Sequence, residues 1–171
     1  MEISIKGASP LDPSSFSHAP SLRILIVHAR WNIEILQHLV DGAKKRLTQV
    51  YKVPSENIVI QSVPGSWELP FVTKQLIQQS IQSGNPFDAV ISIGVLIKGK
   101  TMHFEYISSA VSQGLMNIGL ETGVPVVFGV LTCLTEEQAW LRAGVGAHGT
   151  GAHNHGEDWA DVAVELGSLR K

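Results

Sequence analysis

Residues 92–106 read Ser-Ile-Gly-Val-Leu-Ile-Lys-Gly-Lys-Thr-Met-His-Phe-Glu-Tyr, an apolar run that ends in a Gly-Lys-Thr turn and is followed by a histidine. The part from Gly94 to Thr101 matches G-x-x-x-x-G-K-T, the phosphate loop of nucleoside triphosphatases. That loop needs flexible residues after its first glycine, whereas Val, Leu and Ile stand there and favour a continuing strand. The next apolar run, 126–131, is followed by Thr and Cys instead of a magnesium-binding aspartate. The sequence therefore disfavours triphosphate hydrolysis and predicts a strand that delivers His103 to the end of a sheet.

Apolar runs alternate with amphipathic segments along the chain from Leu22 onward. The predicted strands are nearly continuous in Val, Ile and Leu, as strands covered on both faces are, and they span 23–29, 58–63, 89–97 and 126–132. Helical spacing of apolar residues predicts helices at 33–47, 69–77, 106–121, 135–143 and 158–169. The pattern predicts a three-layer α/β/α sandwich, flavodoxin-like, around a four-stranded parallel sheet. Ligands are then expected at the carboxyl ends of the strands.

The 171 residues fit one domain, which we expect to span 22–171 after an extended N-terminal arm at 1–21. Residues 8–21 hold three prolines and five serines, a composition that cannot bury enough surface to fold alone. Ahead of them, Ile3-Ser-Ile-Lys alternates apolar and polar residues but has no evident partner strand. We expect this short strand to pair with a neighbouring subunit.

Charge and cysteine content exclude several classes of protein. A net charge of −2 and a pI near 6.4, without a Lys/Arg cluster, disfavour nucleic acid and anionic membrane as partners. The single cysteine, Cys133, cannot form an internal disulfide and lies in an apolar context typical of a buried thiol. No apolar run approaches the roughly 20 residues of a membrane helix. A cytoplasmic location is the expectation.

Chemically distinctive residues follow the predicted strands. Trp31 and Trp67 stand just beyond two strand ends, where they form an aromatic wall for a flat heterocycle or, alternatively, cap their helices against the sheet. After the third strand, Lys100, Thr101 and nearby N–H groups are suited to bind a phosphate at a helix start. The positive end of that helix favours a neutral His103 as general base, although a lone histidine there is also compatible with a structural role.

Residues 144–156 contain five glycines and three histidines, His148, His153 and His155. Histidines beside carboxylates are metal ligands in many proteins, but flexible glycine does not preorganise a site and no second cluster exists at ligand spacing. The sequence favours a polar loop that orders on ligand or subunit contact, and no metal. Arg142, just before the loop, is either a bidentate phosphate ligand or a solvated helix residue.

Six ordered blocks between about residues 22 and 169 resemble a known family. They are Ala29-Arg-Trp-Asn32, Val63-Pro-Gly-Ser-Trp-Glu-Leu-Pro70, Gly94-Val-Leu-Ile-Lys-Gly99 with Thr101-Met-His-Phe-Glu-Tyr-Ile107, Pro125-Val-Val-Phe-Gly-Val-Leu-Thr132, Glu136-Glu-Gln-Ala139 with Arg142-Ala-Gly144, and His153-Asn-His-Gly156. The chain resembles the 6,7-dimethyl-8-ribityllumazine synthase family, in its fungal form. Trp31 and the His-Asn-His-Gly block carry the fungal likeness.

The resemblance implies a transferase of riboflavin biosynthesis that acts without cofactor or metal. It condenses 5-amino-6-(D-ribitylamino)pyrimidine-2,4-dione with 3,4-dihydroxy-2-butanone 4-phosphate and releases phosphate and two waters. His103 would move protons, and the implied substrate contacts are Trp31 and Asn32 at the pyrimidine, Ser66, Trp67 and Glu68 at the ribityl chain, Val95, Leu96 and Ile97 at the ring edge, Lys100 and Thr101 at the phosphate, and Phe128 and Arg142 from a neighbouring subunit. Binding of riboflavin or a lumazine analogue at the same place is also implied.

The family also implies assembly into pentamers, and the long glycine-rich segment at 144–156 is of the kind associated with stopping at the pentamer. Two features depart from the family: Lys100 replaces a small residue, and no lysine follows Arg142 near the phosphate before Lys171. His153 or His155 is the candidate substitute. Two alternatives stay open, a riboflavin synthase of the archaeal type that dismutates lumazine, and a flavin-binding scaffold without turnover.

Overall fold

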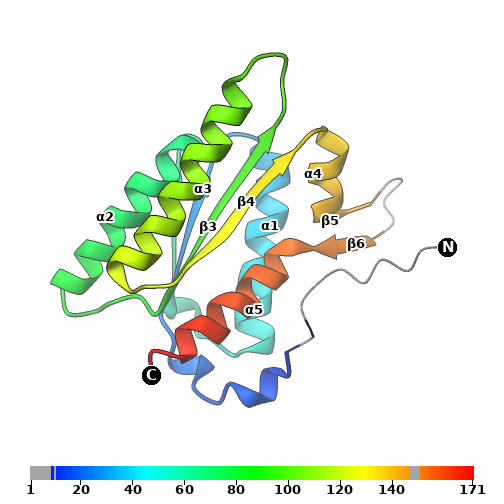
Figure 1. The fold of residues 1–171 in the computed structure, drawn as a ribbon. Coiled ribbons are helices and arrows are strands. Elements are labelled where there is room, and N and C mark those ends of the chain that lie inside the picture. Colours follow the sequence, from blue (N-terminus) through cyan, green and yellow to red (C-terminus); the bar gives the residue numbers. More distant parts are fainter. Residues whose placement is uncertain (1–8, 10, 147–150) are drawn as a thin grey trace.

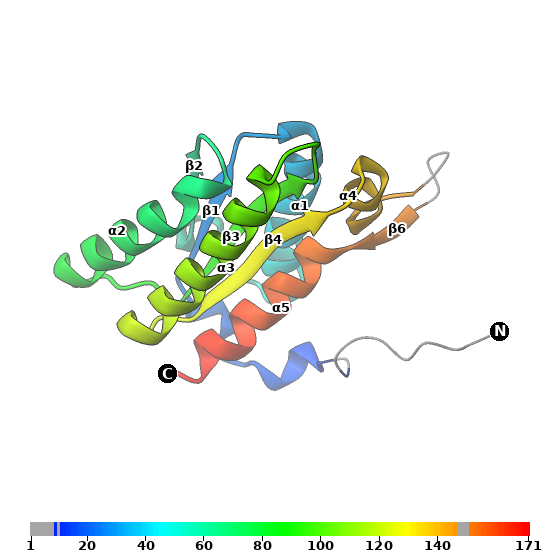
Figure 2. The ribbon, with the colours of Figure 1, turned by 45° about the horizontal axis from the view of Figure 1, so that its top comes forward.

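The computed structural model describes residues 9, 11–146 and 151–171. Its centre is a parallel sheet in the order β2-β1-β3-β4, with all four strands labelled in Figure 2. The four strands are β1 (Ile24–Ala29), β2 (Ile58–Val63), β3 (Ala89–Ile97) and β4 (Val126–Cys133). The predicted four-stranded parallel sheet is confirmed, and the predicted strand bounds differ from these by at most one residue.

Helices cover the sheet in pairs, as the two views in Figures 1 and 2 show. One pair is α1 (Ile33–Lys45), which continues into a π-helical turn at Arg46–Val50, and α5 (His155–Ser168). The other pair is α2 (Leu69–Gln82) and α3 (His103–Thr122). The members of each pair pack on each other and on the strands, so the predicted α/β/α sandwich of the flavodoxin-like class is confirmed.

The central strands explain why the sequence reads as long apolar runs. In β1 every residue except His28 is buried, and in β3 the first seven residues are buried. A strand covered by helices on both faces has no solvent face, so its apolar residues do not alternate with polar ones. The two edge strands are less apolar, and β2 exposes Ile60 and Gln61.

The strands β1 and β3 end at different heights. Their pairing runs from Ile24 opposite Ala89 to His28 opposite Ile93, whereas β3 stays paired with β4 until Ile97 stands opposite Cys133. The last residues of β3 therefore extend beyond β1 and have a strand on one side only. This overhang lies at the carboxyl end of the sheet, where ligands bind in open α/β folds.

The segment predicted to be a polar loop contains two short strands, and this prediction is wrong in part. β5 (Ala143–Val145) pairs antiparallel with β6 (Gly151–Asn154), after the helix α4 (Glu136–Arg142). Glycine has low strand propensity, so the pair was hidden in the sequence. Residues 147–150, which include His148, lie outside the described residues.

Two helices begin earlier than predicted. α3 starts at His103, three residues before the predicted start, and α5 starts at His155, also three residues early. The cap of α5 is Asn154, whose side chain accepts from the Gly156 N–H. Glycine in the first turn lowers helix propensity and conceals a start that the Asn cap provides.

The described part of the expected N-terminal arm holds two short 3-10 turns, Pro13–Ser15 and Ala19–Ser21. Phe16 packs edge-on against Tyr51 with ring centroids 6.2 Å apart, and Ala19 is buried. The end of this segment thus lies against the domain. The strand expected at residues 3–6 falls outside the described residues. No helix in the described ranges is long and apolar enough to cross a membrane.

Candidate active site

A cavity of about 370 Å³ opens at the carboxyl end of the sheet, a volume in the range of small-molecule sites. Its wall combines residues that follow β1 and β2, the end of β3 with the turn after it, and the first two turns of α3. The lining residues are Trp31, Asn32, Gly65, Ser66, Trp67, Val95, Leu96, Ile97, Gly99, Thr101, His103, Phe104 and Ile107. Nine residues that the sequence placed at a ligand therefore lie around one cavity.

The overhang of β3 provides one wall of this cavity. The pairing of β1 with β3 stops at Ile93, so no strand covers that edge of β3 at Val95 and Ile97. Asn32 adopts the left-handed conformation with φ of 63°, which asparagine tolerates better than most residues. This turn lets its Nδ2 donate to the Val95 carbonyl at 3.0 Å. The bond ties the loop that carries Trp31 to the end of β3.

Both tryptophans present their rings to solvent. Trp31 is 73 % exposed and Trp67 is 59 % exposed, although each lines the cavity. Capping a helix against the sheet would have buried them, so the alternative interpretation fails for this chain. Large exposed aromatic surfaces at a cavity are suited to stack on a planar ring.

Ser66 contributes an unpartnered hydroxyl. The residue is 4 % exposed, and its Oγ has no hydrogen-bond partner among the described residues. It lies so close to β3 that a Cβ on Gly94 would come within 2.5 Å of the Ser66 Oγ. A buried hydroxyl without a partner costs about 1–3 kcal/mol. A ligand hydroxyl in the cavity would remove that cost.

Glu68, two residues after Ser66, makes a structural contact. Its Oε2 accepts from the Gly65 N–H at 2.9 Å and so closes the 3-10 turn Ser66–Glu68. Glu68 lines an adjoining hollow together with Trp67, His103, Tyr106 and Ile107. The structure thus places Glu68 next to the main cavity and not on its wall.

The two predicted phosphate residues in the turn between β3 and α3, Lys100 and Thr101, lie in different places. Thr101 lines the cavity together with Gly99, whereas Lys100 is exposed and does not line it. The Thr101 Oγ1 accepts from the His103 N–H at 3.4 Å, a long contact. The N-cap residue, Met102, makes no side-chain capping hydrogen bond. The first N–H groups of this 20-residue helix therefore face the turn with little side-chain competition.

Besides Glu68 and Lys100, three more predicted site residues do not line the cavity of their own chain. Phe128 lies on β4 and is 44 % exposed. Arg142 is exposed at the end of α4, and its Nη1 donates to the Gln138 carbonyl at 3.3 Å. His155 lies at the start of α5, with its Nδ1 3.2 Å from Asp158 Oδ2. Burial lowers the pKa of His155, and Asp158 opposes that shift.

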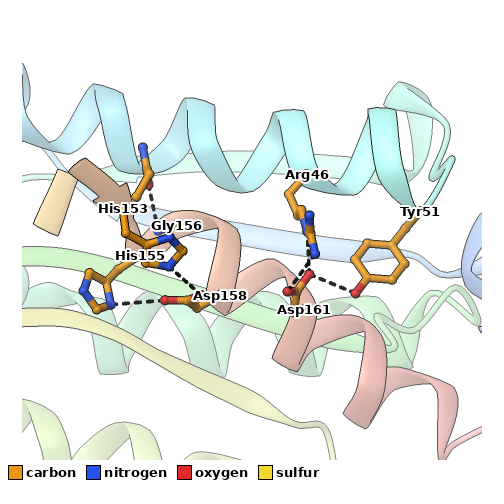
Figure 3. Close-up of polar contacts among 8 residues, drawn as sticks. Arg46, Tyr51, His153, His155, Gly156, Asp158 and Asp161 are labelled. Atoms are coloured by element: carbon orange, nitrogen blue, oxygen red, sulfur yellow. Dashed lines mark hydrogen bonds and ion pairs between the residues drawn. The ribbon is translucent and has the colours of Figure 1, made fainter. Parts of the chain in front are cut away.

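Side-chain contacts fix the His-Asn-His-Gly block, and Figure 3 shows its two histidines beside Asp158. The Asn154 side chain makes three hydrogen bonds: Nδ2 donates to the carbonyls of His38 and Ala143, and Oδ1 accepts from the Gly156 N–H. His153 and His155 both reach Asp158, at 2.7 and 3.2 Å. In the described ranges, no group of three or more His, Cys, Asp and Glu side chains is placed to hold a metal ion.

The prediction missed four lining residues, Gly65, Gly99, Phe104 and Ile107. Phe104 and Ile107 are three residues apart and follow His103, so a helix that starts at His103 places both on the cavity side. The signal was present in the spacing. It was missed because the predicted helix began at Tyr106.

The fold and the cavity define an α/β protein of the flavodoxin-like class, with an aromatic-walled site next to a helix N-terminus. The model of the 6,7-dimethyl-8-ribityllumazine synthase family matches residues 21–171. Two fungal proteins of that name are similar to the chain. One from Schizosaccharomyces pombe is 56 % identical over 163 residues, which cover 95 % of this chain and 94 % of the relative. One from Pyricularia oryzae is 48 % identical over 182 residues, covering 88 % and 89 %.

A bacterial protein of the same name, from Streptomyces coelicolor, is 42 % identical over 140 residues, covering 82 % of this chain and 80 % of the relative. The chain belongs to the 6,7-dimethyl-8-ribityllumazine synthase family. The resemblance seen in the six sequence blocks is therefore confirmed, including its fungal character.

Proposed function

We propose that this chain catalyses the condensation of 5-amino-6-(D-ribitylamino)pyrimidine-2,4-dione with 3,4-dihydroxy-2-butanone 4-phosphate. The products are 6,7-dimethyl-8-ribityllumazine, phosphate and two waters. Family membership supports the reaction, and one observation in the site carries it furthest: an exposed tryptophan and an unpartnered serine hydroxyl line the same cavity. A substrate with a flat ring and a polyhydroxyl chain supplies a partner for each.

In this proposal Trp31 stacks on the pyrimidine ring, and Asn32 holds the loop in place. The ribityl chain runs past Ser66, Trp67 and Glu68, where its hydroxyls donate to the Ser66 Oγ. Val95, Leu96 and Ile97 lie along the ring edge. The apolar walls exclude water, and the two reactants are held together, which contributes several kcal/mol toward lowering the barrier.

The phosphate of the second substrate binds at the turn before α3. Gly99 and Thr101 line the cavity there, and the helix N-terminus favours an anion. Lys100 is exposed beside the turn and adds positive charge at its rim. The amine of the pyrimidine attacks the ketone carbon, and loss of water gives an imine.

His103 then removes a proton from the carbon next to the imine, and the C–O bond to phosphate breaks. The enol left by this elimination takes up a proton on its terminal carbon and becomes a methyl ketone. The second nitrogen closes the ring on this new carbonyl, and the second water leaves. A positioned imidazole contributes about 10² to 10⁴ in rate to such a proton transfer. Each step uses only acid–base and addition–elimination chemistry, so the proposal includes no cofactor.

We propose that the working unit is a homopentamer whose sites lie between subunits. α3 spans 20 residues but buries only Val111, Leu115 and Ile118, and it exposes Tyr106, Met116 and Leu120. Such an apolar helix surface is suited to contact another chain. Phe128 and Arg142, which do not line the cavity of their own chain, are placed by this proposal in the neighbour's site, where Arg142 binds phosphate. His155 is a candidate phosphate contact of the same kind. We place the assembled enzyme in the cytoplasm.

The reaction is tested by mixing the purified chain with both substrates and following the absorbance and fluorescence of the lumazine. We expect product only when both substrates are present. Absence of product with both substrates present would refute the proposal. Consumption of added lumazine with formation of riboflavin would identify a dismutase instead. Light scattering tests the assembly: a pentamer has about five times the 18.5 kDa chain mass. An active monomer would refute the shared site.

A further inference from the structure

An ion pair crosses the turn that carries the proposed phosphate site. The Lys98 Nζ lies 2.5 Å from the Glu105 Oε1, so the pair joins the residue after β3 to the first turn of α3. Between its two members stand Gly99, Thr101 and His103, all of which line the cavity. The pair therefore closes the loop from which the proposed general base projects.

The Lys98 end of this ion pair is fixed to the sheet. The Lys98 N–H donates to the Cys133 carbonyl at 2.9 Å and so continues the β3–β4 pairing by one residue. Across the turn, the Tyr106 N–H donates to the Met102 carbonyl at 3.3 Å in the first turn of α3. Within the described residues, no other ion pair or side-chain hydrogen bond connects β3 or Lys98 to α3. The pair is thus the polar link between two rigid elements.

The surroundings of Glu105 make it sensitive to its partner. Its Oε2 is buried and has no hydrogen-bond donor among the described residues, so Lys98 is the cation that compensates this carboxylate. The hydrogen bond from Lys98 lowers the pKa of Glu105, and the residue's own backbone N–H adds to that shift. A carboxylate in the first helical turn also interacts favourably with the helix dipole.

We infer that Lys98 and Glu105 are a positioning pair for the proposed reaction. The pair sets where His103 and the phosphate turn lie relative to the ring held by β3. The inference rests on the proposed function. Neither residue lines the cavity, so the pair acts through the geometry of the turn. Small displacements of a reacting group are costly in rate even when binding is preserved.

The test uses Lys98→Met, Glu105→Gln, the double variant and Lys98→Arg, with lumazine formation measured at saturating and limiting concentrations of each substrate. Each single change is expected to lower kcat by about tenfold and to leave the KM of the pyrimidine unchanged, because Trp31 and Ser66 are untouched. The double variant is expected to be no worse than either single one, since both remove the same link. Lys98→Arg keeps the cation and should retain most of kcat.

The chain offers a matched control pair. Lys74 Nζ lies 2.7 Å from Glu121 Oε2 and links α2 to α3, with side chains 45 % and 57 % exposed against 46 % and 32 % for Lys98 and Glu105. Breaking this pair with Lys74→Met is expected to leave kcat unchanged. If Lys98 instead bound phosphate directly, its loss would raise the KM of the butanone phosphate while Glu105→Gln would not, and that pattern would overturn the positioning role.

A measurement without turnover separates this inference from the proposed reaction. Amide hydrogen exchange in peptides that cover residues 99–107 should speed up in Lys98→Met and Glu105→Gln, and not in Lys74→Met. If the wild-type chain makes no lumazine, the proposed function fails and the exchange data still decide whether the pair holds the turn. If the wild-type chain is active, additive effects in the double variant or an unchanged kcat would refute the positioning pair alone.

Discussion

Two polar regions of the molecule differ in how completely their groups are paired. In the seam that α5 forms with α1 and the π-helical turn after it, Asp161 accepts from Arg46 Nε at 2.7 Å, from Arg46 Nη2 at 3.1 Å and from the Tyr51 hydroxyl at 2.8 Å (Figure 3). Burial together with Asp161 raises the pKa of Tyr51 to about 12. At the cavity, by contrast, the Ser66 hydroxyl has no partner in the part of the chain that the structure describes, and two tryptophans are exposed.

The difference separates groups that hold the fold from groups that wait for a ligand. A paired carboxylate stabilises the folded chain, because charge-assisted hydrogen bonds leave a net gain after the bonds to water are lost. An unpaired buried hydroxyl destabilises the folded chain and is tolerated where a ligand completes it. Substitutions in the two regions should therefore have opposite signatures, with activity lost at the cavity and stability lost at the seam.

The largest effect is expected at His103. His103→Ala should lower kcat by about 10² to 10⁴, the range for a proton-transfer group, because no other imidazole lines the cavity of the described chain. His103 is exposed, so the melting temperature and the oligomer mass should stay as in wild type. Steady-state kinetics and light scattering make the test, and an unchanged kcat would remove His103 from the mechanism.

The second effect belongs to the seam. Asp161→Ala removes three hydrogen bonds to a partly exposed carboxylate and should lower the free energy of unfolding by about 2 kcal/mol. Urea unfolding at fixed protein concentration measures it, with Asp41→Ala as the control, since the exposed Asp41 accepts from no described side chain but Gln37. The KM values of the remaining folded enzyme should not change. A KM increase as large as the stability loss would contradict the division between the two regions.

Ser66→Ala sharpens the contrast within one residue type. Removing the unpartnered hydroxyl should raise the free energy of unfolding by about 1 kcal/mol and raise the KM of the ribityl substrate by about tenfold. The control is Ser80→Ala, because the equally buried Ser80 Oγ donates to the Ile77 carbonyl at 2.7 Å. That change should cost stability and spare KM. Loss of stability in both variants would show that Ser66 has a partner in the folded protein.

The smallest effect concerns pH at the start of α5. Burial lowers the pKa of His155 below its ordinary value of 6.5, while Asp158 opposes and His153 and Arg142 add to the shift. The unfolded chain then binds more protons than the folded one just below pH 6.5, so stability falls as the pH drops from that value. His155→Gln should flatten this decline in unfolding experiments between about pH 7 and 5. An equally steep decline in the variant would assign it to other groups.

The sequence predicted the sheet well because its strands are covered on both faces. The bounds of β2 and β3 coincide with the predicted ranges, since continuous Val, Ile and Leu end abruptly at turn residues. The predicted arm and the roles of the site residues remain predictions. The pairing of β5 with β6 was not predictable, because Gly144 and Gly151 carry no strand signal and the pair is held by Asn154, a contact across eleven residues.

The site was predictable in its parts and less so in its geometry. Apolar runs followed by Trp31, Trp67 and His103 marked the ends of strands, and parallel strands bring those ends together. Nothing local in the sequence showed that the Ser66 hydroxyl lacks a partner, since this depends on how closely Gly94 lets the two segments approach. The Lys98–Glu105 pair was likewise hidden, because it required a helix that starts at His103.

The overhang of β3 gives the cavity a property that side chains alone do not provide. Residues in a strand alternate between neighbours, and Lys98 bonds to β4, so Ile97 directs its backbone N–H and carbonyl to the opposite side, where β1 has already ended. The Asn32 Nδ2 donates to the Val95 carbonyl, and among the described residues its side chain makes no bond to Ile97. A pyrimidinedione carries alternating carbonyl and N–H groups along its edge, much as a peptide does. In the binding mode proposed above, the ring would therefore continue β1 by one residue, a small-molecule form of β-augmentation.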